Sequence, residues 1–223
     1  LLGLAEVGLE HQKVGRHAGD SADQQDVAEH FHREIDSTAA SLEPLSWRAM
    51  KLASVNGRAH TVVGDVLVDV ETASGGALSS DPMAHVGSLQ ALEGLSAPDD
   101  APRVDATRLD APVPRPPKVL AVGLNYSRHA EETGFDIPDE PVVFAKLTNA
   151  ICGPTDDIVI PPQTPQIDWE VELVVVIGKP GAQIAAADAW DHVAGFTCGQ
   201  DISDRAEQFR AAQQFTYAKS YDT

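Results

Sequence analysis

The chain has 223 residues, and its 16 Lys and Arg oppose 34 Asp and Glu, which gives a formal net charge of −18. A field of that sign repels a phosphate backbone, so nucleic acid is excluded as an expected partner. No apolar stretch approaches the roughly 18 residues that a membrane helix requires, so a membrane is not an expected partner either. Two cysteines, Cys152 and Cys198, without a recognisable secretion signal favour buried free thiols in a cytoplasmic protein.

Residues 1–49 differ in character from the rest of the chain. They hold four of the eight histidines, and Val27, Phe31 and Ile35 recur at helical spacing within a predicted helix over 20–35. A metal site built from these histidines and an exposed helix with solvated histidines both fit the pattern, and the second is the commoner arrangement. We expect residues 1–49 to be an N-terminal extension, helical or poorly ordered.

Residues 50–95 are predicted to form a small N-terminal β domain. Asn56-Gly57 separates two strand-like runs, which is a strong hairpin signal, and Gly64-Asp65 turns the chain again. Strands are therefore expected over 51–55, 58–63 and 66–70, and a short helix over 84–93. Six prolines between residues 96 and 117 disfavour helix and strand ladder alike, so this segment is predicted to be a linker.

Residues 118–223 alternate between predicted strands and predicted short helices. The run KVLAVGL at 118–124 is typical of a buried strand. The other predicted strands cover 141–147, 167–177 and 193–198. The predicted helices cover 126–133, 188–192 and 203–213.

The predicted strand over 167–177 begins with a strict alternation of apolar and acidic side chains. Period two places Asp168, Glu170 and Glu172 on one face, about 6.5–7 Å apart. Crowded carboxylates raise one another's pKa unless a cation offsets them, and the apolar run at 173–177 indicates that the strand enters a core. The pattern predicts a site for Mg²⁺, Mn²⁺ or Ca²⁺. A half-buried strand with one wet acidic face fits it equally well.

Other side chains could add chemistry to such a site. Asp201 follows an apolar strand and could complete a cation shell, or it could cap the next helix. His129 and Glu132 are three positions apart on an expected helix, so the carboxylate could orient the imidazole to activate water; a surface ion pair has the same spacing. Lys146 and Lys219 could neutralise a substrate carboxylate or enolate, or could be ordinary surface lysines.

Several mechanisms lack a signature in this sequence. No GxSxG motif is present, which argues against a serine hydrolase of the α/β-hydrolase kind. No Walker A loop, GxGxxG motif or zinc-spaced Cys/His set is present, so neither a nucleotide cofactor nor a structural zinc site is expected.

Five segments of residues 118–223 carry most of the candidate residues. They read GLNYSRHAEE at 123–132, PVVFAK at 141–146, DWEVEL at 168–173, GFTCGQDISDR at 195–205 and AKSYDT at 218–223. In this order and spacing they resemble the catalytic domain of the fumarylacetoacetate hydrolase family. Two positions depart from the family pattern: Ala206 replaces the usual Asp, and Ala218 replaces the usual Gly. Family members also continue beyond the position of Thr223, so an incomplete domain is expected.

The resemblance implies an α+β, mainly β fold, with a mixed β-roll, short helices and a small β-meander domain before it. It implies a homodimer that uses Mg²⁺ or Mn²⁺, with Ca²⁺ as a further option. The implied metal ligands are Glu170, Glu172 and Asp201. The implied catalytic residues are His129, Glu132 and Lys219. The implied substrate-binding residues are Asn125, Tyr126, Lys146, Arg205 and Gln208.

The family's substrates are small 2-oxo or diketo acids that chelate the metal. The expected reaction is hydrolysis of a C–C bond in an acylpyruvate- or fumarylacetoacetate-type acid, with water activated by the His129–Glu132 dyad. Within the family, oxaloacetate-type decarboxylation and isomerisation or hydration of 2-hydroxyhepta-2,4-diene-1,7-dioate stay open. Outside it, the alternatives are an inactive fragment that keeps only the scaffold and a calcium-binding structural module.

Overall fold

The computed structural model describes residues 50–126, 134, 136, 138–162, 166–210 and 214–222. The residues from Met50 to Thr223 group into one unit. The predicted extension over 1–49, with its helix, lies outside the described residues, as does most of the predicted helix over 126–133.

The first sheet is the predicted three-stranded meander. It consists of β1 (Leu52–Val55), β2 (Arg58–Val63) and β3 (Val66–Asp69) in antiparallel order β1-β2-β3. Asn56 and Gly57 both have positive φ, 51° and 72°, which matches the backbone twist of a two-residue hairpin turn. The apolar side chains of this sheet enter two small core clusters, one of which includes Leu92. The prediction of three strands in this order is confirmed.

Short helical turns follow the meander. They are α2 (Val70–Ala73), η1 (Pro82–His85) and η2 (Leu89–Leu92). The single helix expected over 84–93 is therefore two 3₁₀ turns, separated at Gly87 and Ser88, where glycine and serine favour a turn over a helix interior. Leu92 is 2% exposed, because it packs on Ala59 and Val70.

The proline-rich segment packs against the meander instead of spanning free space. The Leu67 N–H donates to the Pro102 carbonyl at 2.8 Å, and the Val104 N–H donates to the Asp65 carbonyl at 2.9 Å. The chain then forms η3 (Ala106–Arg108) and an isolated bridge from Asp110 to Ser54. Part of the segment expected to be a linker therefore forms an edge of the first sheet, where prolines are tolerated.

Asp69 joins the meander to α2, and its removal should destabilise this region. Its carboxylate accepts from the Arg58 Nε at 2.8 Å and Nη2 at 3.0 Å, and from the Thr72 N–H at 2.9 Å as the helix cap. We expect Asp69→Ala to lower the free energy of unfolding by about 1–2 kcal/mol, measured by urea denaturation. The matched control is Asp65→Ala, since the exposed pair of Asp65 with Arg103 should contribute about 0.5 kcal/mol or less.

The same contact should make this stabilisation depend on pH. The Arg58 guanidinium holds the pKa of the Asp69 carboxyl well below its ordinary value, and the Thr72 N–H acts in the same direction against the opposing effect of burial. A lowered folded-state pKa means that the contribution is complete above the unfolded value of about 3.9 and is lost as the pH falls below it. The gap between wild type and Asp69→Ala should therefore shrink from pH 7 to pH 3; an unchanged gap would refute the assigned ion pair.

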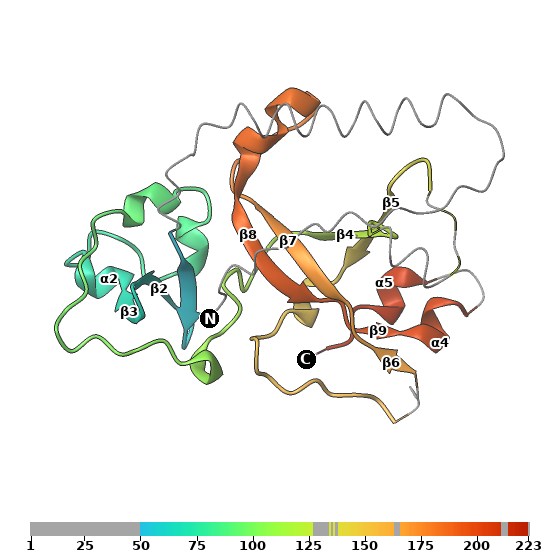
Figure 1. Cartoon of the computed structure of the whole chain (residues 1–223), viewed down its shortest axis with the longest axis horizontal. Helices are drawn as coiled ribbons and strands as arrows, with labels where there is room; N and C mark the ends of the chain where they lie inside the picture. Colours follow the sequence, from blue (N-terminus) through green and yellow to red (C-terminus); the bar gives the residue numbers. More distant parts are fainter. Residues whose placement is uncertain are drawn as a thin grey trace, which may run out of the picture. The chain divides into compact units, whose positions relative to one another are not determined.

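The second part of the unit is built from pairs of strands and short helices (Figure 1). Its antiparallel strand pairs are β4 (Val119–Gly123) with β5 (Val142–Lys146), β6 (Ile167–Asp168) with β9 (Ser203–Asp204), and β7 (Val171–Ile177) with β8 (Val193–Gln200). Its helical elements are η4 (Thr148–Ala150), η5 (Ala186–His192), α4 (Arg205–Gln208) and α5 (Phe215–Ala218). The fold is mainly β with short helices, as predicted.

The acidic strand departs from the prediction in two ways. It is broken at Trp169 and Glu170, because residues before the break pair with β9 and residues after it pair with β8. Its apolar face is also exposed rather than buried: Leu173 and Ile177 are each 60% exposed. The expectation that the run at 173–177 enters a core is wrong, since no second layer covers this face within the described residues.

Three further burial or length predictions are wrong. Leu120, expected in a buried strand, is 65% exposed. Cys198 is exposed and Cys152 is half-buried, so neither is the buried thiol expected. The helix expected over 203–213 is α4, which begins at Arg205 after the strand residues of β9 and ends at Gln208.

Helices of membrane-spanning length and hydropathy do not occur in the described part of the chain.

Candidate metal centre

The junction of the β6–β9 and β7–β8 ladders brings acidic side chains together. The Asp201 N–H, just beyond β8, donates to the Glu170 carbonyl at 2.8 Å and fixes these residues side by side. Glu172 follows within β7. One carboxylate oxygen from each of Glu170, Glu172 and Asp201 lies within 4.8 Å of the other two. The structure thus gathers the three predicted metal ligands into one group, which we call the acidic cluster.

Two lysines face the acidic cluster from separate segments. Lys219, directly after α5, is 4% exposed and donates to Glu170 Oε2 at 3.0 Å, to Asp201 Oδ2 at 2.9 Å and to Ser203 Oγ at 2.6 Å. Lys146, the last residue of β5, contacts Asp201 Oδ1 and the Lys219 carbonyl. The alternative that Lys219 is an ordinary surface lysine is wrong, because its ammonium group is buried among these acceptors.

Glu172 is the carboxylate whose environment penalises its charge. Burial raises the pKa of the Glu172 carboxyl; a hydrogen bond with Tyr126 opposes this effect, and the negative charges of Glu170 and Asp201 reinforce it. The Tyr126 hydroxyl also accepts the Leu173 N–H at 3.1 Å, so it is fixed beside the cluster. Hard carboxylate oxygens with a partly uncompensated charge suit Mg²⁺, Mn²⁺ or Ca²⁺, so the residues present fit such a cation.

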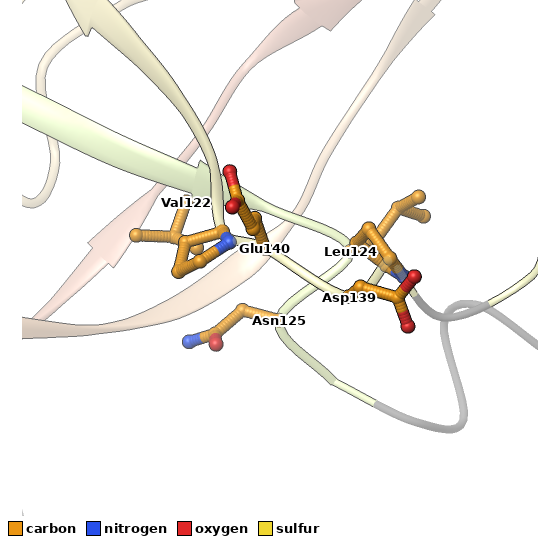
Figure 2. A pocket seen from close by; sticks show the side chains of 7 residues that line it. Val122, Leu124, Asn125, Asp139 and Glu140 are labelled. Carbon is orange, nitrogen blue, oxygen red and sulfur yellow. The ribbon is translucent and has the colours of Figure 1, made fainter.

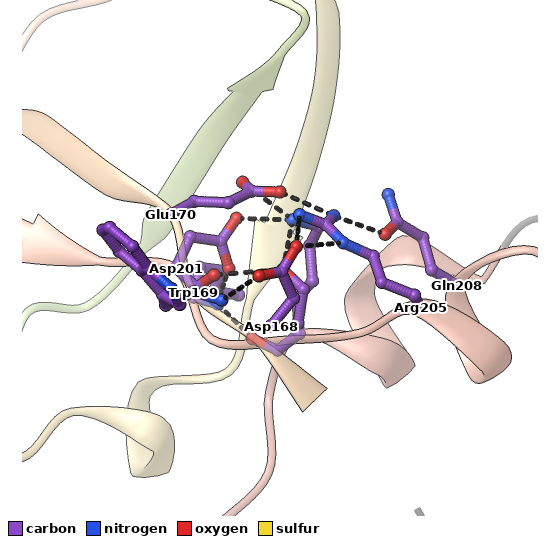
Figure 3. Close-up of polar contacts among 9 residues, drawn as sticks. Asp168, Trp169, Glu170, Asp201, Arg205 and Gln208 are labelled. Atoms are coloured by element: carbon purple, nitrogen blue, oxygen red, sulfur yellow. Dashed lines mark hydrogen bonds and ion pairs between the residues drawn. The ribbon is translucent and has the colours of Figure 1, made fainter. Parts of the chain in front are cut away.

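Arg205 and Gln208, both from α4, lie beside Glu170 (Figure 3). The Arg205 guanidinium donates to Asp168 Oδ2 from Nε at 3.0 Å and from Nη2 at 2.8 Å, and its Nη1 pairs with Glu170 Oε1 at 2.6 Å. The same Nη1 donates to Gln208 Oε1 at 2.9 Å. The hydrogen bonds from Arg205 to Asp168 hold the pKa of the Asp168 carboxyl below its ordinary value. Of the predicted substrate-binding residues, Arg205 therefore contacts a member of the acidic cluster, and Gln208 contacts Arg205.

Of the remaining predicted residues, Asn125 lies in the described part of the chain. His129 and Glu132 lie outside the described residues. Asn125 lines a shallow hollow of about 250 Å³ beside the end of β4, together with Leu124 and residues 138–141 (Figure 2). No member of the acidic cluster lines this hollow. Asn125 thus belongs, in this structure, to a feature separate from the predicted metal ligands.

Sequence reasoning overlooked two contacts of the centre. Ser203, fully buried, accepts from Lys219 and donates to the Asp201 carbonyl at 3.0 Å. The residue that caps α4 is Asp204, so the alternative role of Asp201 or Ser203 as a helix cap is wrong. The acidic residue three positions later, Glu207, was the available signal for that cap.

Comparison with known proteins identifies the class. Residues 118–223 match the family described as "Fumarylacetoacetate (FAA) hydrolase C-terminal". The human mitochondrial protein named oxaloacetate tautomerase FAHD2A is 50% identical over 123 residues, which is 55% of this chain and 39% of that protein. The chain spans less than half the length of this relative.

Two solved structures show the same fold. One is a probable 2-hydroxyhepta-2,4-diene-1,7-dioate isomerase from Mycobacterium abscessus, at 29% identity and a TM-score of 0.62, covering 78% of this chain and 60% of that one. The other is maleylpyruvate hydrolase from Sphingobium sp. SYK-6 in complex with manganese(II) and pyruvate, at 29% identity and a TM-score of 0.59, covering 78% and 63%. Residues 118–223 therefore correspond to the C-terminal domain of the fumarylacetoacetate hydrolase family, and the relatives named above are a tautomerase, a probable isomerase and a hydrolase.

Proposed function

We propose that this protein is a divalent-metal-dependent enzyme that hydrolyses a C–C bond in a small 2-oxo or diketo acid of the acylpyruvate or fumarylacetoacetate type. The observation that carries the proposal is the convergence of three carboxylates, which offer oxygens within 4.8 Å of one another, and two of which pair with the buried Lys219. Glu170, Glu172 and Asp201 would hold Mg²⁺ or Mn²⁺, with Ca²⁺ as a weaker candidate. The solved relative that contains both manganese and pyruvate supports this assignment.

A divalent cation at these carboxylates would supply Lewis acidity toward an oxo group and stabilise an enolate relative to the ketone. The buried ammonium group of Lys219 and the half-buried one of Lys146 both contact Asp201, and they would neutralise negative charge that develops on substrate oxygens. His129 and Glu132 would take the proton from the attacking water, and Tyr126 and Gln208 would line the substrate side of the cluster. These roles are proposals for each residue.

Binding of metal and an oxo-acid mimic tests the proposal directly. We expect saturating Mn²⁺ to raise the melting temperature by about 5–10 °C, since a ligand at about 100 times its Kd stabilises by about 2.7 kcal/mol. Oxalate, which mimics the enolate of pyruvate, should add to this shift. Glu170→Gln should lose both shifts, while Glu140→Gln, an exposed glutamate outside the cluster, should keep both.

A cooperatively melting wild-type protein that ignores Mn²⁺ would contradict the proposed metal site and favour an inactive scaffold. A response to Ca²⁺ alone, with no effect of oxalate, would instead favour a calcium-binding structural module. Both outcomes are read in the same titration, so neither depends on knowing the substrate.

A second candidate, oxaloacetate tautomerisation, is favoured by the 50% identity to the human tautomerase. Product analysis separates the candidates. Hydrolysis of an acylpyruvate yields pyruvate and a free acid, decarboxylation releases CO₂, and tautomerisation or isomerisation changes the ultraviolet spectrum without producing fragments. A homodimer, a cytoplasmic location and a role in the catabolism of aromatic compounds stay predictions; the human relative is named mitochondrial.

A further inference from the structure

Arg205 is almost fully engaged by protein groups. A guanidinium has five N–H donors in a fixed planar arrangement. Its contacts to Asp168, Glu170 and Gln208 comprise four donor–acceptor pairs, so one donor is left for any other partner. This geometry favours a role in holding other side chains over a role as the main anchor of a substrate carboxylate.

Asp168 accepts three hydrogen bonds, although its side chain is 47% exposed. Its Oδ2 accepts two N–H groups of Arg205, and its Oδ1 accepts the Trp169 N–H at 2.9 Å. Asp168 lies in β6, whose partner β9 leads into Arg205, and the Arg205 N–H donates to the Gln166 carbonyl at 2.9 Å. Backbone pairing and the side-chain ion pair therefore fix Arg205 against Asp168 together.

Arg205, held in this way, contacts one of the two carboxylate oxygens of Glu170. Its Oε1 pairs with Arg205 at 2.6 Å, and its Oε2 accepts from Lys219 at 3.0 Å. The strand is broken at residues 169–170, but the Asp201 N–H holds the Glu170 backbone through its carbonyl at 2.8 Å. The Glu170 carboxylate is therefore held by Arg205 at one oxygen and by Lys219 at the other; Figure 3 shows the contact with Arg205.

We propose that Asp168 is a positioning residue: it fixes the Arg205 guanidinium, and Arg205 in turn aims the Glu170 carboxylate at Glu172 and Asp201. This inference rests on the proposed metal-dependent function. It assigns Asp168 the orientation of a metal ligand instead of direct contact with the metal. Removal of a group that hydrogen-bonds to a metal ligand and orients it commonly lowers metal affinity by about 10–100-fold.

Calorimetric titration of the full chain with Mn²⁺, at a temperature below melting, measures the Mn²⁺ affinity and so tests this role. We expect Asp168→Asn to weaken Mn²⁺ binding about tenfold or more while the protein still melts cooperatively. Arg205→Lys should weaken binding to a similar extent, because an ammonium keeps the charge but cannot contact two carboxylates in one plane. The double variant should be little worse than either single variant, since both act through the same contact. Asp188→Asn, at an exposed aspartate in η5, is the control and should bind like wild type.

The result that overturns the inference is a folded Asp168→Asn protein with wild-type Mn²⁺ affinity while Glu170→Gln has lost it. If Asp168→Asn and Glu170→Gln both bind Mn²⁺ like wild type, or if the wild type does not bind Mn²⁺, the metal site itself is overturned. Additive effects of Asp168→Asn and Arg205→Lys would show that Asp168 acts on the site independently of Arg205, which also contradicts the proposal.

Discussion

Lys219→Met is expected to lower the free energy of unfolding of the metal-free protein by about 3 kcal/mol. The ammonium group is buried and is shared by Glu170 and Asp201, so its removal leaves buried negative charge without its main partner. Removing one member of a buried ion pair typically costs about 3–5 kcal/mol, and Lys146, which still pairs with Asp201, places this case at the lower end. Urea denaturation in the presence of EDTA measures the loss.

The same substitution should have the opposite effect on metal binding. Lys219 presents a positive charge to two of the three proposed ligand carboxylates, and this charge opposes a second cation. We expect Lys219→Met to bind Mn²⁺ about tenfold more tightly than wild type, which corresponds to about 1.4 kcal/mol. Lys118→Met, at an exposed lysine, should change neither quantity. Weaker Mn²⁺ binding by folded Lys219→Met would argue that Lys219 organises the ligands more than it repels the metal.

Alternation, a local property of a strand, predicted that Glu170 and Glu172 share a face, although it included Asp168 as well; the resemblance to the family implied the full set with Asp201. Glu170 and Glu172 are two residues apart, and Asp201 follows the strand that pairs with theirs, so ordinary antiparallel pairing is sufficient to gather them. The hairpin at Asn56-Gly57 was predictable for the same reason, since its turn chemistry lies within two residues.

The partners of the cluster could not be predicted in this way. Asp168 shares the alternation with Glu170, yet its carboxylate pairs with Arg205, 37 positions away, because the ladder changes partner at Trp169. Nothing in the spacing of residues 167–173 marks that break. The choice of partner is set by tertiary pairing, which a local pattern does not contain.

Burial was predicted poorly for a related reason. Alternation shows which face of a strand is apolar, but not whether another layer covers it. Leu173 and Trp169 carry the apolar side of the pattern, yet they are 60% and 65% exposed, whereas the acidic side faces inward toward Lys219. In this strand the ionic contacts, rather than the apolar side chains, lie in the interior of the described residues.

Asp201→Asn should produce the largest combined loss, because Asp201 is the shared partner of both lysines and a proposed metal ligand. It is 5% exposed, and its two carboxylate oxygens accept from Lys146 and Lys219 separately. We expect the free energy of unfolding to fall by about 2–4 kcal/mol and the Mn²⁺ affinity to fall by more than about 100-fold. The control is Asp139→Asn, at an exposed aspartate of the hollow beside β4.

Combining Asp201→Asn with Lys219→Met separates ion pairing from simple loss of packing. If the stability effect of each single variant comes from leaving the other charge unpaired, the double variant should be destabilised by clearly less than the sum, with a coupling energy of at least about 1 kcal/mol. Additive destabilisation would assign the losses to packing. Mn²⁺ binding should stay weak in the double variant, because removing the repulsive ammonium does not replace the missing carboxylate. Destabilisation that is less than additive, together with Mn²⁺ binding that stays weak, would distinguish the structural role of this ion pair from the ligand role of Asp201.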